Sequence, residues 1–289
     1  MERIKACELL IDLQRRPDKT RTGCLLYRTF DNKFVKIFSG DVTKDEKETI
    51  IKNVSKPIDI EGVVKPSSFV VAGRDEIIGY TMDNISGQND ITYESKLDNS
   101  VKNNLHRIAS KYQQLESIVK NAGENIVFPC LPDRDSIIID EHGKIRLVNY
   151  ENIQVGDSMP GVHPLLIDSR AGISGSFTKY YNTDGISNGG SWPIFKKELD
   201  KKGLIVYFLT SVFGLDVKTA LDPNVYNYWL VMEVLGGQNC DQDLYDKIML
   251  VNSDDPNEFI GNDIQRIAEK YDLVDCPGKV EYTRKLKLK

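Results

Sequence analysis

The sequence predicts an α+β protein that begins with short strands and continues mainly with helices. Three pairs of apolar runs flank short turns within residues 23–148, which is the pattern of β-hairpins. Apolar residues recur at helical spacing over residues 101–118 and over several stretches after residue 199. A run of strands followed by a run of helices is typical of the α+β class.

In the first part, polar turns separate runs that alternate like strands. GCLLYRTF and KFVKIFSG flank Asp31-Asn32 and predict the first hairpin. DEKETIIKNV follows as a short helix whose first turn is acidic. SSFVV and EIIGYTM flank the turn at residues 72–75 and predict a second hairpin, after which ISGQND is expected to be a linker.

The later part is predicted to be mainly helical, with one more hairpin. Val101, Leu105, Ile108, Tyr112 and Leu115 lie on one face of a helix. SIIID and KIRLV flank a turn that contains glycine, which predicts the third hairpin. The segment at residues 156–198 is rich in Gly, Ser, Asn and Thr, and a loop of this length is usually functional. The helices expected after it are LIVYFLTSVFG, NYWLVMEVL, DLYDKIMLV and NDIQRIAEKYDL.

Composition and charge exclude several classes of protein. The chain has 289 residues, of which 40% are hydrophobic and 28% charged, as in ordinary globular proteins. Its net charge of −5 provides no general attraction to nucleic acid, and no apolar run is long enough to span a bilayer. Five scattered cysteines and three scattered histidines indicate neither a disulfide framework nor a metal site. We expect a cytoplasmic protein without nucleic-acid or membrane partners.

FVKIF, YTMDNISG, SIIIDEHGKIRLVNYE and DKKGLIVYFLTSVFG follow one another along the chain. In sequence and in order, these four motifs resemble those of the protein kinase family, over roughly residues 20–275. FVKIF is similar to the strand that carries the phosphate-binding lysine, and YTMDNISG to the last small-lobe strand and hinge. SIIIDEHGKIRLVNYE resembles the segment that joins the metal-binding asparagine to the metal-binding aspartate. DKKGLIVYFLTSVFG resembles the central helix of the large lobe. The resemblance implies a bilobal fold with a small β-rich lobe at 1–86, a helical lobe at 87–280 and a basic tail at 281–289.

The resemblance also assigns positions in a nucleotide cleft. Lys36 takes the place of the phosphate-binding lysine and is expected to pair with Glu46 or Glu48 on the short helix. The other implied positions are the gatekeeper Met82, the start of the hinge at Asp83, and the pocket floor at Ile137 and Ile138.

At the positions that phosphoryl transfer depends on, the residues differ from those that the family uses. Asn149 stands in place of the metal-binding aspartate, and a neutral amide is a weaker ligand for magnesium than a carboxylate. The catalytic loop is FPCLPDRDS, which leaves two alignments open. If Ser136 takes the asparagine position, the catalytic base falls on Leu131, whereas one extra loop residue would place it on Cys130. Asp133 and Asp135 are the nearby acids.

The positions that would contact the nucleotide also differ from those of the family. Only Gly23 remains of the glycine-rich loop, next to Leu25 and Leu26, so backbone amides approach a phosphate less easily. Phe34 replaces the small alanine on which adenine lies, and its ring is expected to close the adenine slot.

Other implied roles are structural. Asp200, at the start of the central helix, is expected to be buried and to accept hydrogen bonds from catalytic-loop amides. Phe128 and Tyr150 are expected to stack in the hydrophobic column that joins the lobes.

The expected function is therefore a pseudokinase that binds or scaffolds another protein and needs no cofactor. Its partner would contact the cleft or the 156–198 segment, where residues 170–191 are expected to be mobile and to order on binding through Phe177, Tyr180 and Tyr181. The alternative is an atypical active Ser/Thr kinase that uses ATP with Mg²⁺, in which Asp133, Asp135, Asn149 or Glu151 takes over the lost roles. A small-molecule phosphotransferase of similar fold is a third possibility.

Overall fold

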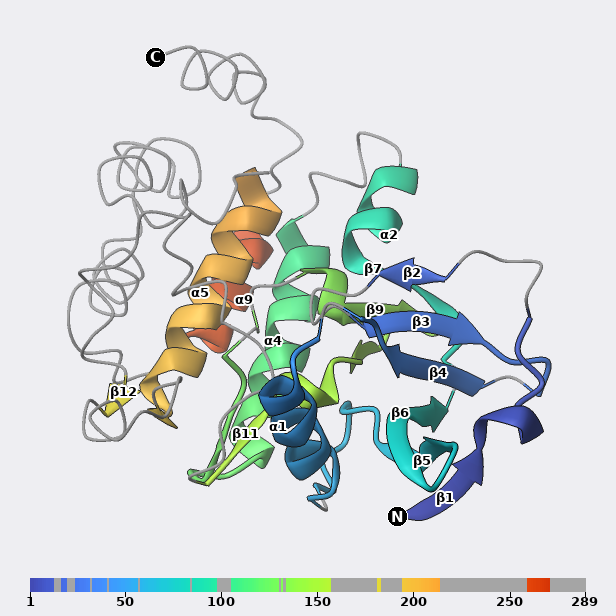
Figure 1. Ribbon diagram of the computed structural model, residues 1–289. Coiled ribbons are helices and arrows are strands. Elements are labelled where there is room, and N and C mark those ends of the chain that lie inside the picture. Colours follow the sequence, from blue (N-terminus) through green and yellow to red (C-terminus); the bar gives the residue numbers. More distant parts are fainter. Residues whose placement is uncertain are drawn as a thin grey trace, which may run out of the picture.

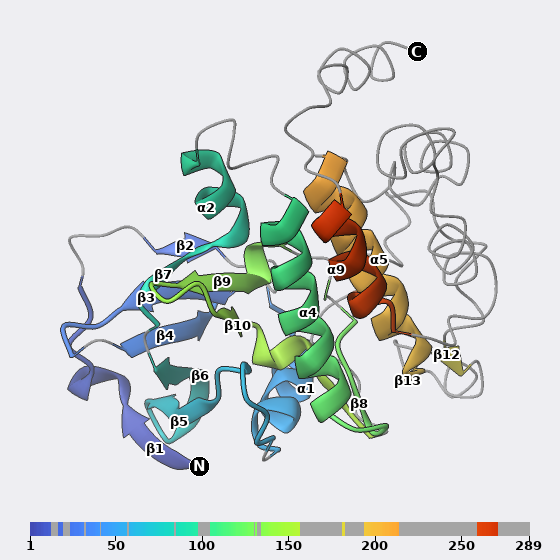
Figure 2. The same ribbon diagram turned by 180° about the vertical axis from the view of Figure 1, so that it is seen from behind.

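The computed structural model places a mixed β-sheet beside a group of helices (Figure 1). Helices α4, α5 and α9 lie side by side at the end of the molecule away from the sheet, and the view from behind agrees (Figure 2). The protein is therefore of the mixed α+β class. The structure describes residues 1–12, 17–19, 24–31, 33–40, 42–56, 58–83, 85–97, 105–129, 131, 134–156, 181–182, 194–213 and 259–270.

The large sheet has six strands in the order β1-β5-β6-β4-β3-β2. β1 runs parallel to β5, and all the other neighbours in this sheet are antiparallel. The strands are β1 (Glu2–Lys5), β2 (Asp18–Lys19), β3 (Cys24–Arg28), β4 (Lys33–Phe38), β5 (Pro66–Ala72) and β6 (Glu76–Asp83).

Both hairpins predicted in this region are confirmed. β3 pairs with β4 around the turn that contains Asp31, and β5 pairs with β6 around residues 73–75. β4 is central, between β3 and β6, so its residues have strand neighbours on both sides. Lys36 lies opposite Tyr80 in this register and Phe34 lies opposite Met82, which places these four residues on one face of the sheet.

Helix α1 (Lys44–Val54) confirms the predicted short helix. It begins with a capping box, in which Thr43 Oγ1 accepts from Glu46 N and the Glu46 carboxylate accepts from Thr43 N at 2.7 Å. Its inward face carries Ile50, Asn53 and Val54, all of which are buried. The cap therefore fixes where the helix starts, and the buried residues define the inward face, which contacts the 3-10 helix η3 (Tyr150–Asn152).

A second sheet has the order β10-β9-β7. β9 (Ile137–Asp140) and β10 (Ile145–Leu147) form the third predicted hairpin, which is confirmed. The expectation of a linker at ISGQND was wrong, because β7 (Gly87–Asn89) pairs with β9 and helix α2 (Asp90–Lys96) begins at once. Gly87 makes this pairing possible, since a Cβ there would lie 2.5 Å from the Ile139 carbonyl oxygen.

Helix α4 packs against both α5 and α9. The predicted helices correspond to α4 (Leu105–Asn121), α5 (Glu198–Phe213) and α9 (Gly261–Lys270). Tyr112 of α4 meets Phe208 of α5 edge to face, with ring centroids 6.1 Å apart. Glu116 of α4 accepts a hydrogen bond from Gly261 N at 2.7 Å and so caps the start of α9. The helices expected at NYWLVMEVL and DLYDKIMLV lie outside the described residues.

Short elements complete the described fold. β8 (Ile126–Val127) pairs with β11 (Gln154–Val155), and β12 (Tyr181–Asn182) pairs with β13 (Ile194–Phe195). Three short 3-10 helices are η1 (Ala6–Glu8), η2 (Arg134–Ser136) and η3 (Tyr150–Asn152). No helix of the described part is both long and apolar enough to cross a membrane.

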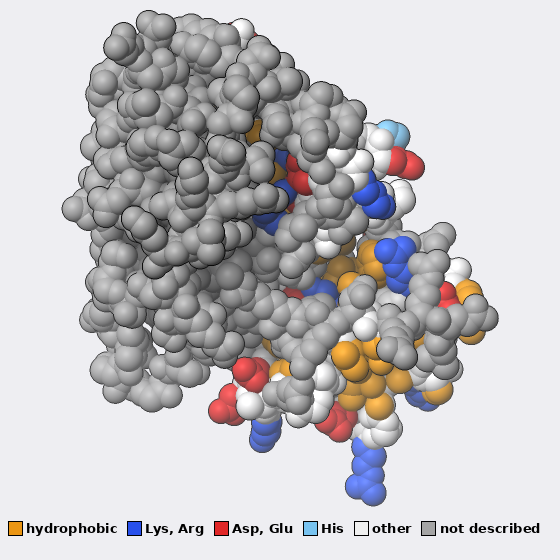
Figure 3. All heavy atoms as spheres, turned by 90° about the horizontal axis from the view of Figure 1, so that it is seen from above, with side chains coloured by type: hydrophobic (Ala, Val, Ile, Leu, Met, Phe, Trp, Pro, Cys, Tyr) orange, Lys and Arg blue, Asp and Glu red, His pale blue; other side chains and the backbone are white. Residues whose placement is uncertain are grey.

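The buried apolar side chains form a continuous cluster that runs from Cys24 and Phe38 in the sheet to Phe208 and Ile264 in the helices. A few large hydrophobic side chains remain exposed, among them Leu10 and Phe30. Seen from above, hydrophobic side chains gather on the side of the molecule that carries the large sheet, with Lys and Arg projecting at its rim (Figure 3).

Candidate functional site

The centre of the site is an ion pair between Lys36 on β4 and Glu151 in η3. Lys36 Nζ lies 2.7 Å from Glu151 Oε1, and the two side chains are only 2% and 0% exposed. The same ammonium donates to Asn149 Oδ1 at 2.8 Å and to the Val148 carbonyl oxygen at 3.3 Å. The amine thus has three oxygen acceptors, all supplied by the four residues that follow β10.

Glu151 also connects to β6 and to α1. Tyr80 donates its hydroxyl to Glu151 Oε2 at 2.5 Å, and Asn53 Nδ2 donates to the Glu151 carbonyl oxygen at 3.2 Å. Burial, followed by the nearby Glu151 charge, holds the pKa of Tyr80 well above its ordinary value, so the phenol stays protonated and donates. Glu151 therefore joins two strands of the large sheet through its carboxylate and helix α1 through its backbone carbonyl.

The expected pairing of Lys36 with Glu46 or Glu48 was wrong. Glu46 is the third residue of α1 and is used by the Thr43 cap. Glu48 is 67% exposed and lies 3.8 Å from Lys44 on the same helix. Both acids lie in the first two turns of α1, whereas the buried Asn53, near the end of the helix, faces inward and donates to the Glu151 carbonyl oxygen.

Asn149 and Ser136 lie together where the resemblance would place metal ligands. Asn149 Nδ2 donates to Ser136 Oγ, while Asn149 Oδ1 accepts from Lys36, so both ends of the amide are engaged. Leu131 lies next to them and is buried. With Phe128 and Asn152, these residues line a hollow of only about 20 Å³. Two further candidates, Cys130 and Asp133, and the side chain of Asp135 lie outside what the structure describes.

Phe34 is half-buried rather than enclosed. It packs against the core cluster, and the Arg28 guanidinium lies 5.0 Å from the centre of its ring. Met82 is buried beside it, whereas Asp83 at the end of β6 is exposed. Ile138 is partly buried on β9, between Asn89 and Arg146. The hollow of about 20 Å³ is lined by none of these four residues.

Asp200 has the surroundings expected of a structural acid. It is fully buried, and its Oδ1 accepts from Phe128 N at 2.7 Å. Its Oδ2 lies 3.0 Å from Lys197 Nζ. Burial raises the pKa of Asp200 to about 6, although the Lys197 charge and the Phe128 amide act in the opposite direction.

Tyr150 anchors η3 through its hydroxyl. This oxygen accepts from Ile58 N at 2.9 Å and donates to the Lys56 carbonyl oxygen at 2.5 Å. Phe128 and Tyr150 belong to the same core cluster, but within the described residues their rings make no aromatic contact with each other. The expected stack of these two rings is therefore absent from the described part.

Two residues of this site, Tyr80 and Asn53, carry no motif that singles them out. Tyr80 begins the YTMDNISG motif, which assigns it no role of its own, and Asn53 lies in the last turn of a short helix. The sequence signal that could have pointed to them is Glu151, which follows Asn149 and Tyr150 directly after a strand. If that strand is buried, the carboxylate of Glu151 is buried too and needs hydrogen-bond donors close to it. Within the described residues, no group of three or more His, Cys, Asp or Glu side chains could hold a metal ion.

The chain matches no family model and no curated protein.

Proposed function

We propose that this protein is a non-catalytic relative of the protein kinases that binds or scaffolds another protein. The four motifs and the order of the elements support a kinase-like bilobal fold, with the large sheet as the small lobe. The observation that carries the functional proposal is the buried contact between Lys36 and Glu151. The Lys36 side chain is only 2% exposed and its ammonium has three acceptors from its own chain, so a nucleotide phosphate would have to displace one of them.

The chemistry of the neighbouring positions supports the same proposal. Phosphoryl transfer needs metal ligands and a base for the acceptor hydroxyl. In the described part, Asn149 is bonded to both Lys36 and Ser136, and Leu131 offers no proton acceptor. The Asn149–Ser136 contact favours the alignment in which Ser136 takes the asparagine position and Leu131 the base position. General-base assistance contributes about 10²–10⁴ in rate, and none of these groups supplies it.

A nucleotide-binding experiment tests the proposal. The melting temperature is measured with ATP alone, with ATP and Mg²⁺, and with ATP and Mn²⁺, and no shift is expected in any of the three. Binding tighter than about 100 μM, or roughly −5.5 kcal/mol, would contradict the closed centre. The active-kinase alternative predicts a shift that depends on the metal.

A transfer assay completes the test. Radiolabelled ATP is offered with the chain alone and with generic protein substrates, and no transfer is expected. Any transfer must be repeated with Lys36→Met, because a contaminating kinase would keep its activity in that preparation. Transfer that disappears in a Lys36→Met preparation that circular dichroism shows to be folded would establish the active alternative.

Phe34→Ala tests the adenine slot separately. The half-buried ring contributes roughly 1–2 kcal/mol to the free energy of unfolding, less than a fully buried phenylalanine. We expect the variant to remain unable to bind ATP, because Lys36 stays paired with Glu151. A variant that gained ATP binding would show that Phe34, rather than the ion pair, closes the centre.

A further inference from the structure

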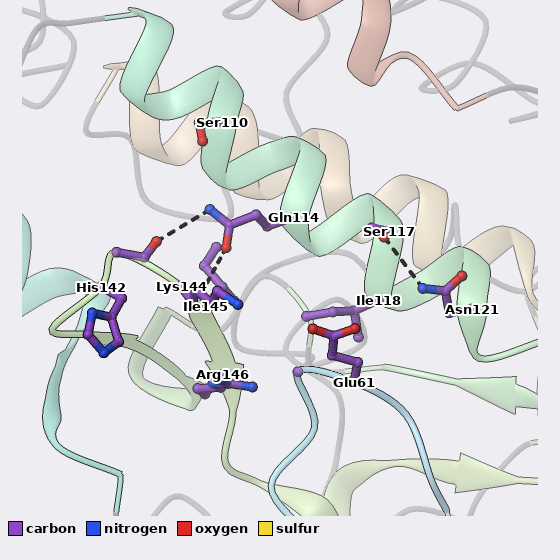
Figure 4. A pocket seen from close by; sticks show the side chains of 12 residues that line it. Glu61, Ser110, Gln114, Ser117, Ile118, Asn121, His142, Lys144, Ile145 and Arg146 are labelled. Atoms are coloured by element: carbon purple, nitrogen blue, oxygen red, sulfur yellow. Dashed lines mark hydrogen bonds between the residues drawn. The ribbon is translucent and has the colours of Figure 1, made fainter.

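A second hollow lies away from the Lys36 centre, between α4, the loop at Glu61 and Gly62, and the turn that joins β9 to β10 (Figure 4). Its volume is about 480 Å³, which is within the range of ligand sites. The wall on α4 is one helix face, and the opposite wall is the end of the β9–β10 hairpin. Lining residues from α4 are Ser110, Gln114, Ser117, Ile118 and Asn121.

Hydrogen bonds between neighbouring elements hold the walls of the hollow in place. Gln114 accepts from Ile145 N at 3.0 Å and donates to the Gly143 carbonyl oxygen at 3.3 Å, which joins α4 to the turn (Figure 4). Leu147 N donates to the Gly62 carbonyl oxygen at 2.8 Å, which joins β10 to the loop. Gly62 has φ +90°, and a Cβ there would lie 2.5 Å from Ile118 Cδ1, so the loop fits closely against α4. The hollow is therefore preformed.

The charged groups of the hollow stand on different walls. Lys144 and Arg146 come from the hairpin, and Glu61 comes from the loop that faces them (Figure 4). Neither Lys144 nor Glu61 has an ion-pair partner within the described part of the chain, and both are exposed. A carboxylate could thus meet the hairpin side while a donor meets Glu61.

Asp140 holds Arg146 in place without covering it. Asp140 Oδ2 accepts from Arg146 Nε at 3.4 Å, and within the described part of the chain the two terminal nitrogens of the guanidinium make no further ion pair. Asp140 Oδ1 accepts from the backbone amides of His142 and Lys144, at 2.9 and 2.8 Å. Burial would raise the pKa of Asp140, but these amides and the Arg146 charge lower it overall, so the carboxylate is ionised and the guanidinium stays oriented.

We infer that this hollow, which we call the hairpin groove, binds an extended segment of a partner protein, with an acidic side chain against Lys144 and Arg146 and N–H donors against Glu61. Small-molecule sites are mostly apolar and enclose their ligand. The hairpin groove is open, and its rim is formed by charged, hydroxyl and amide side chains over Ile118 and Ile145. That composition suits a polar protein–protein contact, in which charged pairs set the register.

The inference deepens the proposed binding role, but it rests on no residue of the Lys36 centre. The test uses the full chain and three pools of labelled hexapeptides with blocked termini. Their two central positions are Asp-Glu, Ala-Ala or Lys-Lys, and the other positions are random. We expect the Asp-Glu pool to bind most tightly and to weaken as the salt concentration rises.

Two opposite variants then locate the binding. Lys144→Glu should weaken binding of the Asp-Glu pool about fivefold, and Glu61→Lys should strengthen it, as expected when exposed charges are reversed. Lys44→Glu is the matched control, because Lys44 is 86% exposed on α1 and should leave binding unchanged. Equal binding of the three pools, or no response to both groove variants, would overturn the inference. The groove variants are also tested for a melting-temperature shift with ATP. Because no groove residue belongs to the Lys36 centre, that result should equal the result for the unchanged chain, so failure of the groove proposal can be told apart from failure of the proposed function.

Discussion

The ammonium of Lys36 lies 2.7 Å from a carboxylate oxygen of Glu151, and neither side chain reaches solvent. A buried pair of this kind is tolerated only when further hydrogen bonds satisfy both charges. Asn149 supplies one for the ammonium and Tyr80 one for the carboxylate. The pair therefore joins β4 to the chain that follows β10, and its two hydrogen-bond partners satisfy both charges.

Removing one member of this pair should strongly destabilise the protein. Glu151→Gln leaves the buried Lys36 charge without its counter-charge, and we expect a loss of roughly 3–5 kcal/mol in the free energy of unfolding, measured by urea denaturation. Glu48→Gln is the control, since Glu48 is 67% exposed and its loss should change stability by less than about 0.5 kcal/mol. Equal stability of the two variants would contradict the buried pair.

A double variant separates charge from packing. Lys36→Met with Glu151→Leu removes both charges and keeps apolar volume, so it should recover much of the loss seen in Glu151→Gln. If the double variant loses more unfolding free energy than Lys36→Met and Glu151→Leu lose together, the hydrogen bond from Tyr80 to the Glu151 side chain outweighs the charge.

Asp200 should be essential for stability. Asp200→Ala leaves the Phe128 amide without its acceptor inside the protein, and we expect a cost of about 2–4 kcal/mol, measured by chemical denaturation. Asp59→Ala removes a carboxylate that is 91% exposed and should have little effect. An unchanged melting temperature in Asp200→Ala would rule out this role.

The pH dependence of stability should carry the signature of Asp200. The pKa of Asp200 is about 6 in the folded protein and 3.8 in an unperturbed group, so the folded state binds this proton more tightly. The stability that this proton contributes is present in full below about pH 4 and is lost as the pH rises through about 6. The difference in unfolding free energy between the native chain and Asp200→Asn should therefore fall over that window. A difference that rises with pH would contradict it.

Gly79 should tolerate no side chain. A Cβ at this position on β6 would lie 2.1 Å from the Lys36 carbonyl oxygen and 3.0 Å from Ile37 Cα, and both of these atoms belong to the backbone of β4. Gly79→Ala should push the two strands apart and cost at least about 2 kcal/mol, measured by thermal or urea denaturation. Gly40→Ala is the control, since no atom lies within 4 Å of a Cβ there. Similar stability of both variants would contradict the close strand contact.

Hairpins and helices were predictable from the sequence because their signals are local. The turn at Asp31-Asn32 and the Gly-containing turn before Lys144 separate apolar runs, and each marks a hairpin that the structure contains. The strand at Gly87–Asn89 was missed because its polar residues have no strand pattern of their own. It forms only because β9 offers a free edge.

The acid that pairs with Lys36 could not be predicted from local patterns. Lys36 was expected to meet Glu46 or Glu48, which are close in sequence and carry the correct charge. Glu46 instead accepts from the Thr43 backbone in the cap of α1, and Glu48 lies on the outer face of the same helix. Glu151 reaches Lys36 from more than a hundred residues away, and no spacing rule connects positions so distant in the chain.

Glu151 follows Asn149 by two residues within a short 3-10 turn, so its contact with Lys36 depends on the length of that turn. Proteins that share this arrangement should be recognisable by joint variation of three separate positions rather than by any contiguous motif. Where the glutamate is replaced by glycine, the tyrosine on β6 would lose its acceptor and become free to change to an apolar residue. Such covariation would show that the lysine, the glutamate and the tyrosine change together as one buried unit.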